Sequence, residues 1–145
     1  MKKTMLTVTA LAVGLFAASC GGTDLNSMQK EGAAILDKIC VTLQTAADKT
    51  ASIADGTELA VMLEGTVSNS SVLQDEYYRW LSDKKLGAEN EAKLMDLMKT
   101  KWDEVDAKNV QLADIIGQLM LKFEGNTEIQ NRLEDVSIFL VGGGC

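Results

Sequence analysis

The sequence predicts an all-α protein, an antiparallel up-down-up-down four-helix bundle that follows a cleaved signal peptide. Proline, which breaks helices, is absent from all 145 residues. Four segments repeat apolar residues every three or four positions, the period of a helix with one buried face. Short runs of polar residues and glycine separate these segments. Because short connections return the chain alongside itself, consecutive helices are expected to run antiparallel.

Residues 1–19 have the layout of a secretory signal peptide. Lys2 and Lys3 give a cationic start, an apolar run covers residues 5–18, and small residues precede Cys20. The apolar run is shorter than the roughly 20 residues that a membrane-spanning helix needs. The sequence therefore predicts export, with cleavage in front of Cys20.

The residues Ala17-Ala18-Ser19-Cys20 resemble the lipobox of bacterial lipoproteins, in the style of the Bacteroidetes group. The resemblance implies that Cys20 receives diacylglycerol and becomes the first mature residue, with residues 20–24 as a lipidated cysteine and short stalk. Ala17 departs from the branched residue usual in the family. The same residues suit ordinary signal peptidase, which would leave Cys20 free, and an uncleaved signal anchor is the third alternative.

This resemblance also implies a location. The membrane becomes a partner through the lipid on Cys20, and the chain belongs to the bacterial cell envelope. Gly21 differs from the aspartate that, in enteric bacteria, retains lipoproteins at the inner membrane. The outer membrane is therefore favoured, with the periplasmic or surface face left open.

The first mature helix is predicted over residues 25–52. Asp24 or Thr23 is its expected N-cap, because a short polar side chain can accept a hydrogen bond from the first turn. Its apolar face comprises Leu25, Met28, Ile35, Leu36, Ile39, Leu43 and Ala46.

The second helix is predicted from the turn at Asp55 to Leu86, before Gly87. Asp55 and Glu58 have the spacing of a capping box. Residues 65–71, which read GTVSNSS, favour helix weakly. The sequence therefore leaves open whether this helix is continuous or breaks near Ser70, where Ser71 and Gln74 could cap a restart.

The third helix is the most regular, with apolar residues recurring every three or four positions from Met95 to Phe123 and Gly125 as its terminator. The fourth is predicted to begin at Asn126 or Thr127 and to place Ile129, Leu133, Val136 and Leu140 on one side. The bundle would thus cover residues 25–141, and residues 142–145 would form a glycine-rich tail that ends in cysteine.

Cys40 and Cys145 are predicted to form a disulfide bond. With Cys20 lipidated, two thiols remain in an oxidising compartment. In the expected topology the fourth helix lies beside the first and ends near the height of Cys40. The bond would close a loop of roughly a hundred residues, which stabilises by at most about 4–5 kcal/mol. Two alternatives stay open: Cys40 as a small core residue with an unpaired tail, and Cys145 bonded to another molecule.

The composition excludes several classes of chemistry. The chain has no histidine, which excludes histidine-based catalytic triads, histidine-ligated haem and the common zinc sites. It also lacks a Cys-x-x-Cys pair and a glycine-rich phosphate loop. The carboxylates Asp103, Glu104 and Asp106 are expected on a solvated face, and Met95 and Met98 in the core. We predict no catalytic residue, no metal site and no cofactor.

One polar residue, Asn109, interrupts the apolar face of the third helix. Thr66 and Asn69 of the second helix are expected at about the same height. Such a polar layer has two interpretations: a device that fixes the register of the helices, or a small polar pocket for a ligand.

The charge balance bears on partners. The formal net charge is −7, and removal of Lys2 and Lys3 with the signal leaves 12 basic and 21 acidic residues. Nucleic acid is excluded, because its affinity comes from clustered Lys and Arg. The predicted function is a non-enzymatic, lipid-anchored envelope protein with an envelope protein as partner or a structural task. The alternative is a small-ligand-binding bundle.

Overall fold

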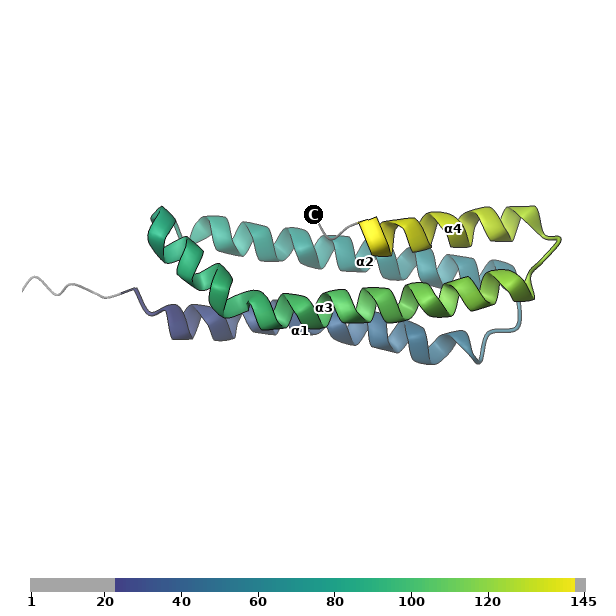
Figure 1. The fold of residues 1–145 in the computed structure, drawn as a ribbon, viewed down its shortest axis with the longest axis horizontal. Helices are drawn as coiled ribbons and strands as arrows, with labels where there is room; N and C mark the ends of the chain where they lie inside the picture. The colour runs from purple at the N-terminus through teal and green to yellow at the C-terminus, as the bar shows by residue number, and fades with distance from the viewer. Residues whose placement is uncertain (1–22, 143–145) are drawn as a thin grey trace, which may run out of the picture.

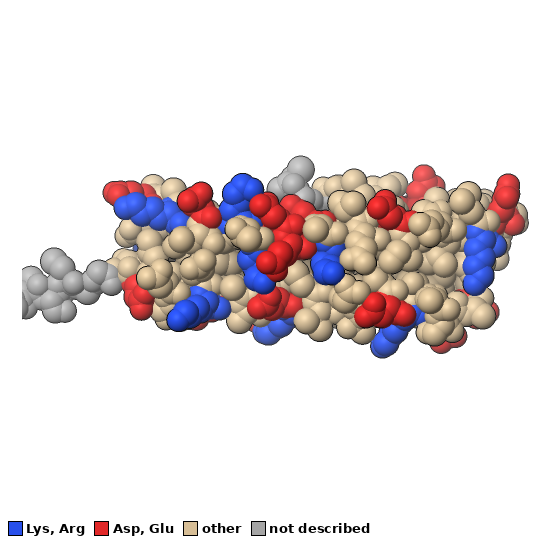
Figure 2. All heavy atoms as spheres, turned by 60° about the horizontal axis from the view of Figure 1, so that its bottom comes forward, with Lys and Arg blue, Asp and Glu red and all other residues tan. Residues whose placement is uncertain are grey.

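The computed structural model describes residues 23–142, and all secondary structure in this range is helical. Its four helices are α1 (Leu25–Thr50), α2 (Gly56–Asp83), α3 (Ala88–Lys122) and α4 (Thr127–Gly142). They alternate in direction and form an elongated rod (Figures 1 and 2). The predicted all-α four-helix bundle is confirmed. The signal peptide, Cys20 and Cys145 lie outside the described residues.

Side-chain caps fix the start of three helices. The Asp24 carboxylate accepts a hydrogen bond from the Ser27 amide at 3.1 Å, and Asp55 accepts from the Glu58 amide at 2.8 Å. Asn126 accepts from the amide of Ile129 at 3.2 Å. The first two are caps expected from the sequence, and all three satisfy an amide that has no partner in the first helical turn.

Helix α2 runs without interruption from Gly56 to Asp83, so no break occurs near Ser70. Thr66 and Ser70 are buried in the middle of the weak segment. The Thr66 hydroxyl donates to the carbonyl of Met62, one helical turn earlier. Packing of a buried face contributes more to helix stability than local propensity, which differs by only about 0.5–1 kcal/mol per residue.

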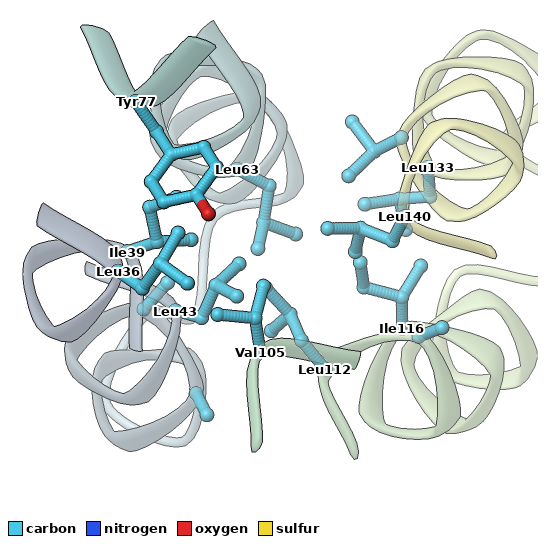
Figure 3. Packing of buried hydrophobic residues seen from close by; sticks show 14 of the residues in the cluster. Leu36, Ile39, Leu43, Leu63, Tyr77, Val105, Leu112, Ile116, Leu133 and Leu140 are labelled. Atoms are coloured by element: carbon cyan, nitrogen blue, oxygen red, sulfur yellow. The ribbon is translucent and has the colours of Figure 1, made fainter. Parts of the chain in front are cut away.

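The lateral order of the helices differs from the expected one. Helix α1 packs against α2 and α3, and α4 packs against the same two helices, whereas the backbones of α1 and α4 do not approach each other closely in the described chain. Viewed down the bundle, α1 lies diagonally opposite α4, and α2 opposite α3 (Figure 3). The expectation that α4 lies beside α1 is therefore wrong. The connection 84–87 crosses the end of the bundle diagonally, which places α1 beside α3 in parallel.

Helix α4 is the shortest and covers only one part of the rod (Figure 1). It ends beside the middle of α3, where Leu140 and Val141 share a hollow with Asp106, Asn109 and Val110. The bundle therefore has a four-helix part, which contains α4, and a three-helix part beyond its end, which contains the start of α1, the end of α2 and the start of α3.

Within the described residues, no helix is both long enough and apolar enough to span a bilayer.

Candidate functional site

The thiol of Cys40 lies half-buried on α1, facing α3. Burial raises its pKa, and the charged neighbours that act on it include Lys101 and Glu104 of α3. Residues 23–142 contain no disulfide bond, and Cys40 is a free thiol there. The premise that α4 runs alongside α1 does not hold, although α4 does end near the height of Cys40. Pairing with Cys145, which lies outside the described residues, stays a prediction.

The carboxylates of the α3 segment that could suggest acid–base chemistry are exposed, as expected. The ammonium group of Lys99 lies 2.8 Å from the Asp103 carboxylate, and Lys101 lies 2.6 Å from Glu104. Lys101 also bridges to Asp37 of α1 at 2.8 Å, and hydrogen bonds to both carboxylates raise the pKa of its ammonium group. No group of three potential metal ligands occurs in residues 23–142.

The two methionines of α3 have different environments. Met98 is fully buried, as expected, but Met95 is 38% exposed, so its assignment to the core is wrong. Its sulfur accepts a hydrogen bond from the Tyr77 hydroxyl at 3.8 Å. Met95 therefore satisfies the one polar atom of a tyrosine side chain that is otherwise buried among apolar groups.

Thr66 and Asn69 lie together at the seam between α1 and α2, the first buried and the second exposed. Both line a surface groove between α1 and α2, and Asn69 is exposed. The groove has a volume of about 390 Å³. It is lined by Val41, Thr42, Thr45, Ala46 and Lys49 of α1 and by Val61, Met62, Gly65, Thr66 and Asn69 of α2.

The groove exists because small side chains line the outer seam of the two helices. A Cβ atom at Gly65 would meet nothing within 4 Å. Val41 and Val61 border the groove and are 64% and 57% exposed. Lys49 is the only charged residue in its lining. The sequence marks residues 65–71 as a weak point of the helix, whereas Gly65, one turn after the exposed Val61, is also a signal for an open seam.

Asn109 lies elsewhere, between α3 and α4. It is only 8% exposed and lines a hollow of about 190 Å³ with the end of α4. The three residues of the expected polar layer are therefore divided between the α1–α2 groove and the α3–α4 hollow. This placement favours the register interpretation of Asn109, because it sets a buried amide where Leu140 of α4 packs.

An aromatic cluster occupies the inside of the three-helix part. The rings of Tyr77 and Trp102 meet edge-to-face at 5.2 Å, and those of Tyr77 and Trp80 lie 5.4 Å apart. Tyr78 is 51% exposed and stacks on Trp102 at 6.1 Å. Tyr78 and the partly exposed Met95 belong to the parts of α2 and α3 that extend past the end of α4.

No family model, no curated protein and no solved structure matches the chain.

Proposed function

We propose that this protein is a lipid-anchored component of the bacterial cell envelope, and that its bundle serves in protein interaction or envelope structure without catalysing a reaction. The observation that carries the proposal is the lipobox-like sequence ending at Cys20. It is followed within a few residues by Leu25, the first residue of α1. A lipid on Cys20 would hold a rigid rod close to its membrane through a short stalk.

The surface of the rod supports a role in contact rather than in catalysis. The candidate acid–base carboxylates are exposed and held in ion pairs with lysines, as at Asp103 and Glu104. General acid–base catalysis favours carboxylates whose pKa is raised by burial. Exposed apolar residues, among them Val41, Val61 and Val72, offer surface for a partner protein.

The anchor is tested by replacing one cysteine. Cys20→Ser removes the lipid attachment site, so the protein is expected to move from the membrane fraction to the soluble envelope fraction. Cys40→Ser is the matched control and is expected to stay in the membrane fraction. Retention of Cys20→Ser in the membranes would contradict the proposal. Crosslinking in the envelope should then capture a reproducible protein partner. The variant Tyr78→Ala tests whether the exposed ring of the aromatic cluster contacts that partner.

A second candidate function, small-ligand binding, is favoured by the groove between α1 and α2. Its valines can pack against an apolar group, while Thr66, Asn69 and Lys49 offer polar contacts at the same hollow. Native mass spectrometry of the protein taken from membranes would detect a retained small molecule. Gly65→Leu should fill the groove and abolish that binding. Gly117→Leu is the matched control, because Gly117 also lies in a helix with nothing within 4 Å of its Cβ position.

A further inference from the structure

The charge of the bundle is distributed unevenly along its length. The ion pairs Lys38–Glu76 and Asp37–Lys101 mark residues of α1, α2 and α3 that lie at the same height. We define the proximal end as everything on the side of these pairs that holds the start of α1, namely residues 23–36 and 78–100. It carries six basic and six acidic residues.

The remainder of the described chain, residues 37–77 and 101–142, also carries six basic residues but has fifteen acidic ones. The whole formal charge of the mature bundle therefore belongs to this distal part. In Figure 2 basic and acidic side chains are interspersed at the end where residue 23 lies, and a patch dominated by acidic side chains lies closer to the middle of the rod.

Helix dipoles add to the contrast. The proximal end presents the N-termini of α1 and α3 and the C-terminus of α2. Each helix N-terminus carries roughly half a positive charge and each C-terminus the opposite, so one positive end remains uncompensated. At the far end of the rod two N-termini and two C-termini cancel. The proximal end thus has no net negative formal charge to repel an anionic layer, whereas the distal part as a whole does.

The proximal end also carries side chains suited to a bilayer surface. A hollow of about 460 Å³ lies beside the first turn of α1. Its lining includes Leu25, Leu97 and Lys93 together with the carboxylates Asp24 and Asp96. Leu97 is 38% exposed. Lys85 protrudes from the connection between α2 and α3 with a positive φ of 49°. Apolar groups next to flexible ammonium groups fit the boundary between acyl chains and phosphates.

We infer that the proximal end is the surface with which the protein contacts an anionic phospholipid layer, so that the rod stands on the membrane with its acidic part pointing away. This inference rests on the proposed anchor at Cys20, which places the start of α1 next to the bilayer. A rod lying flat would bring its acidic side chains within the Debye length of the lipid charge, about 8 Å at physiological ionic strength. Helix α3 alone is about 50 Å long, so an upright rod keeps most of them outside that distance.

The orientation is measured with the lipidated protein in vesicles of phosphatidylcholine and phosphatidylglycerol. In a background of Cys40→Ser and Cys145→Ser, a fluorophore is attached either at Lys85→Cys, in the proximal end, or at Glu124→Cys, at the far end. Spin-labelled lipids then report contact with the bilayer. We expect quenching several-fold stronger at position 85 than at position 124. Equal quenching at both positions, or none at position 85, would overturn the inference.

Charge-reversal variants supply the control. The double variant Lys30→Glu and Arg79→Glu makes the proximal end acidic and is expected to reduce quenching at position 85. The matched distal pair, Lys49→Glu and Lys122→Glu, should leave it unchanged. An equal response to the two pairs would show that the local charge of the proximal end does not set the orientation, and circular dichroism verifies that each variant is folded.

Failure of the anchor is separated from failure of the orientation by a second attachment. A hexahistidine sequence in place of Cys20 binds nickel-chelating lipids, and the natural chain has no histidine to compete. The same contrast between positions 85 and 124 is expected on these vesicles, whether or not the native protein proves to be acylated.

Discussion

In the four-helix part of the bundle the interior is filled by aliphatic side chains from α2, α3 and α4, such as Leu63, Ile116 and Leu133 (Figure 3). In the three-helix part, where α4 is missing, the buried ring of Tyr77 and the partly buried rings of Trp80 and Trp102 supplement the aliphatic core. Helices α2 and α3 are diagonal partners without close backbone contact. Large rings are therefore needed to bridge them once no fourth helix fills the space.

The three-helix part also requires the Trp80 ring to approach the backbone of α1 closely. A Cβ atom at Gly32 would lie 2.7 Å from the Trp80 ring, so glycine gives the indole its place against α1. The Trp80 indole nitrogen donates to the Glu31 carboxylate at 3.1 Å. Large aromatic rings can therefore fill the space that a short helix leaves open. This requires a glycine, here Gly32, on the neighbouring helix against which the ring packs.

The largest effect is expected from removing the ring at the centre of the three-helix part. Tyr77 is fully buried, and Tyr77→Ala should lower the free energy of unfolding by about 3–5 kcal/mol because it leaves a cavity. Tyr78→Ala, at a half-exposed ring, should cost about 1 kcal/mol. Urea denaturation followed by circular dichroism measures both. Similar small losses would show that the aromatic cluster does not hold α2 and α3 together.

A smaller effect, with opposite signs in two places, is expected at glycines. Gly32→Ala should destabilise by about 1–3 kcal/mol, because the new methyl group collides with Trp80. Gly65→Ala should stabilise by about 0.5–1 kcal/mol, because its site is open and alanine favours helix. Thermal unfolding of the two variants gives the comparison. A stabilising Gly32→Ala would contradict the close packing.

Asn109 tests the seam between α3 and α4 in the four-helix part. Asn109→Leu should raise the melting temperature, with a gain in stability of about 1 kcal/mol, since a buried amide is replaced by an apolar group beside Leu140. Asn69→Leu is the control and should change stability by less than about 0.5 kcal/mol, because Asn69 is exposed. Loss of a bound small molecule in Asn109→Leu would instead favour the pocket interpretation.

The smallest effect is expected from pH. The hydrogen bonds from Lys84 and Trp80 lower the pKa of Glu31, and that from Arg132 lowers the pKa of Glu64 below its ordinary value of 4.5. These pairs therefore contribute stability above pH 4.5 that is lost as the pH falls through the lowered pKa. Glu64→Gln should flatten this part of the curve by less than about 1 kcal/mol, because the pair is partly exposed and solvent screens it. If stability depends on pH in Glu64→Gln as it does in the natural protein, Glu64 does not contribute to that dependence.

The sequence predicted the number of helices, their alternating directions and the caps of the first two, because the apolar period and residues such as Asp24 and Asp55 act within a single helix or turn. It did not predict that α2 is continuous, because Thr66 and Ser70 are buried by packing against helices that are distant in the sequence. The lateral order was also missed. An apolar face shows which side of a helix points inward, but not which helix lies next to it.

The candidate site was predicted less well for the same reason. Thr66, Asn69 and Asn109 were placed in one layer by height alone, whereas the direction in which each side chain points separates them. Met95 was assigned to the core from its position in a repeat that continues past the end of α4, where no helix covers it. The second error comes from treating the rod as four helices along its whole length.

The central claim, that this bundle is held at a membrane by a lipid on Cys20, is tested most directly by the intact mass of the protein extracted from bacterial membranes. The account predicts a mature chain that begins at Cys20 and is heavier than its sequence by the mass of diacylglycerol, with or without a further acyl chain. An unmodified chain recovered from the soluble fraction would contradict it.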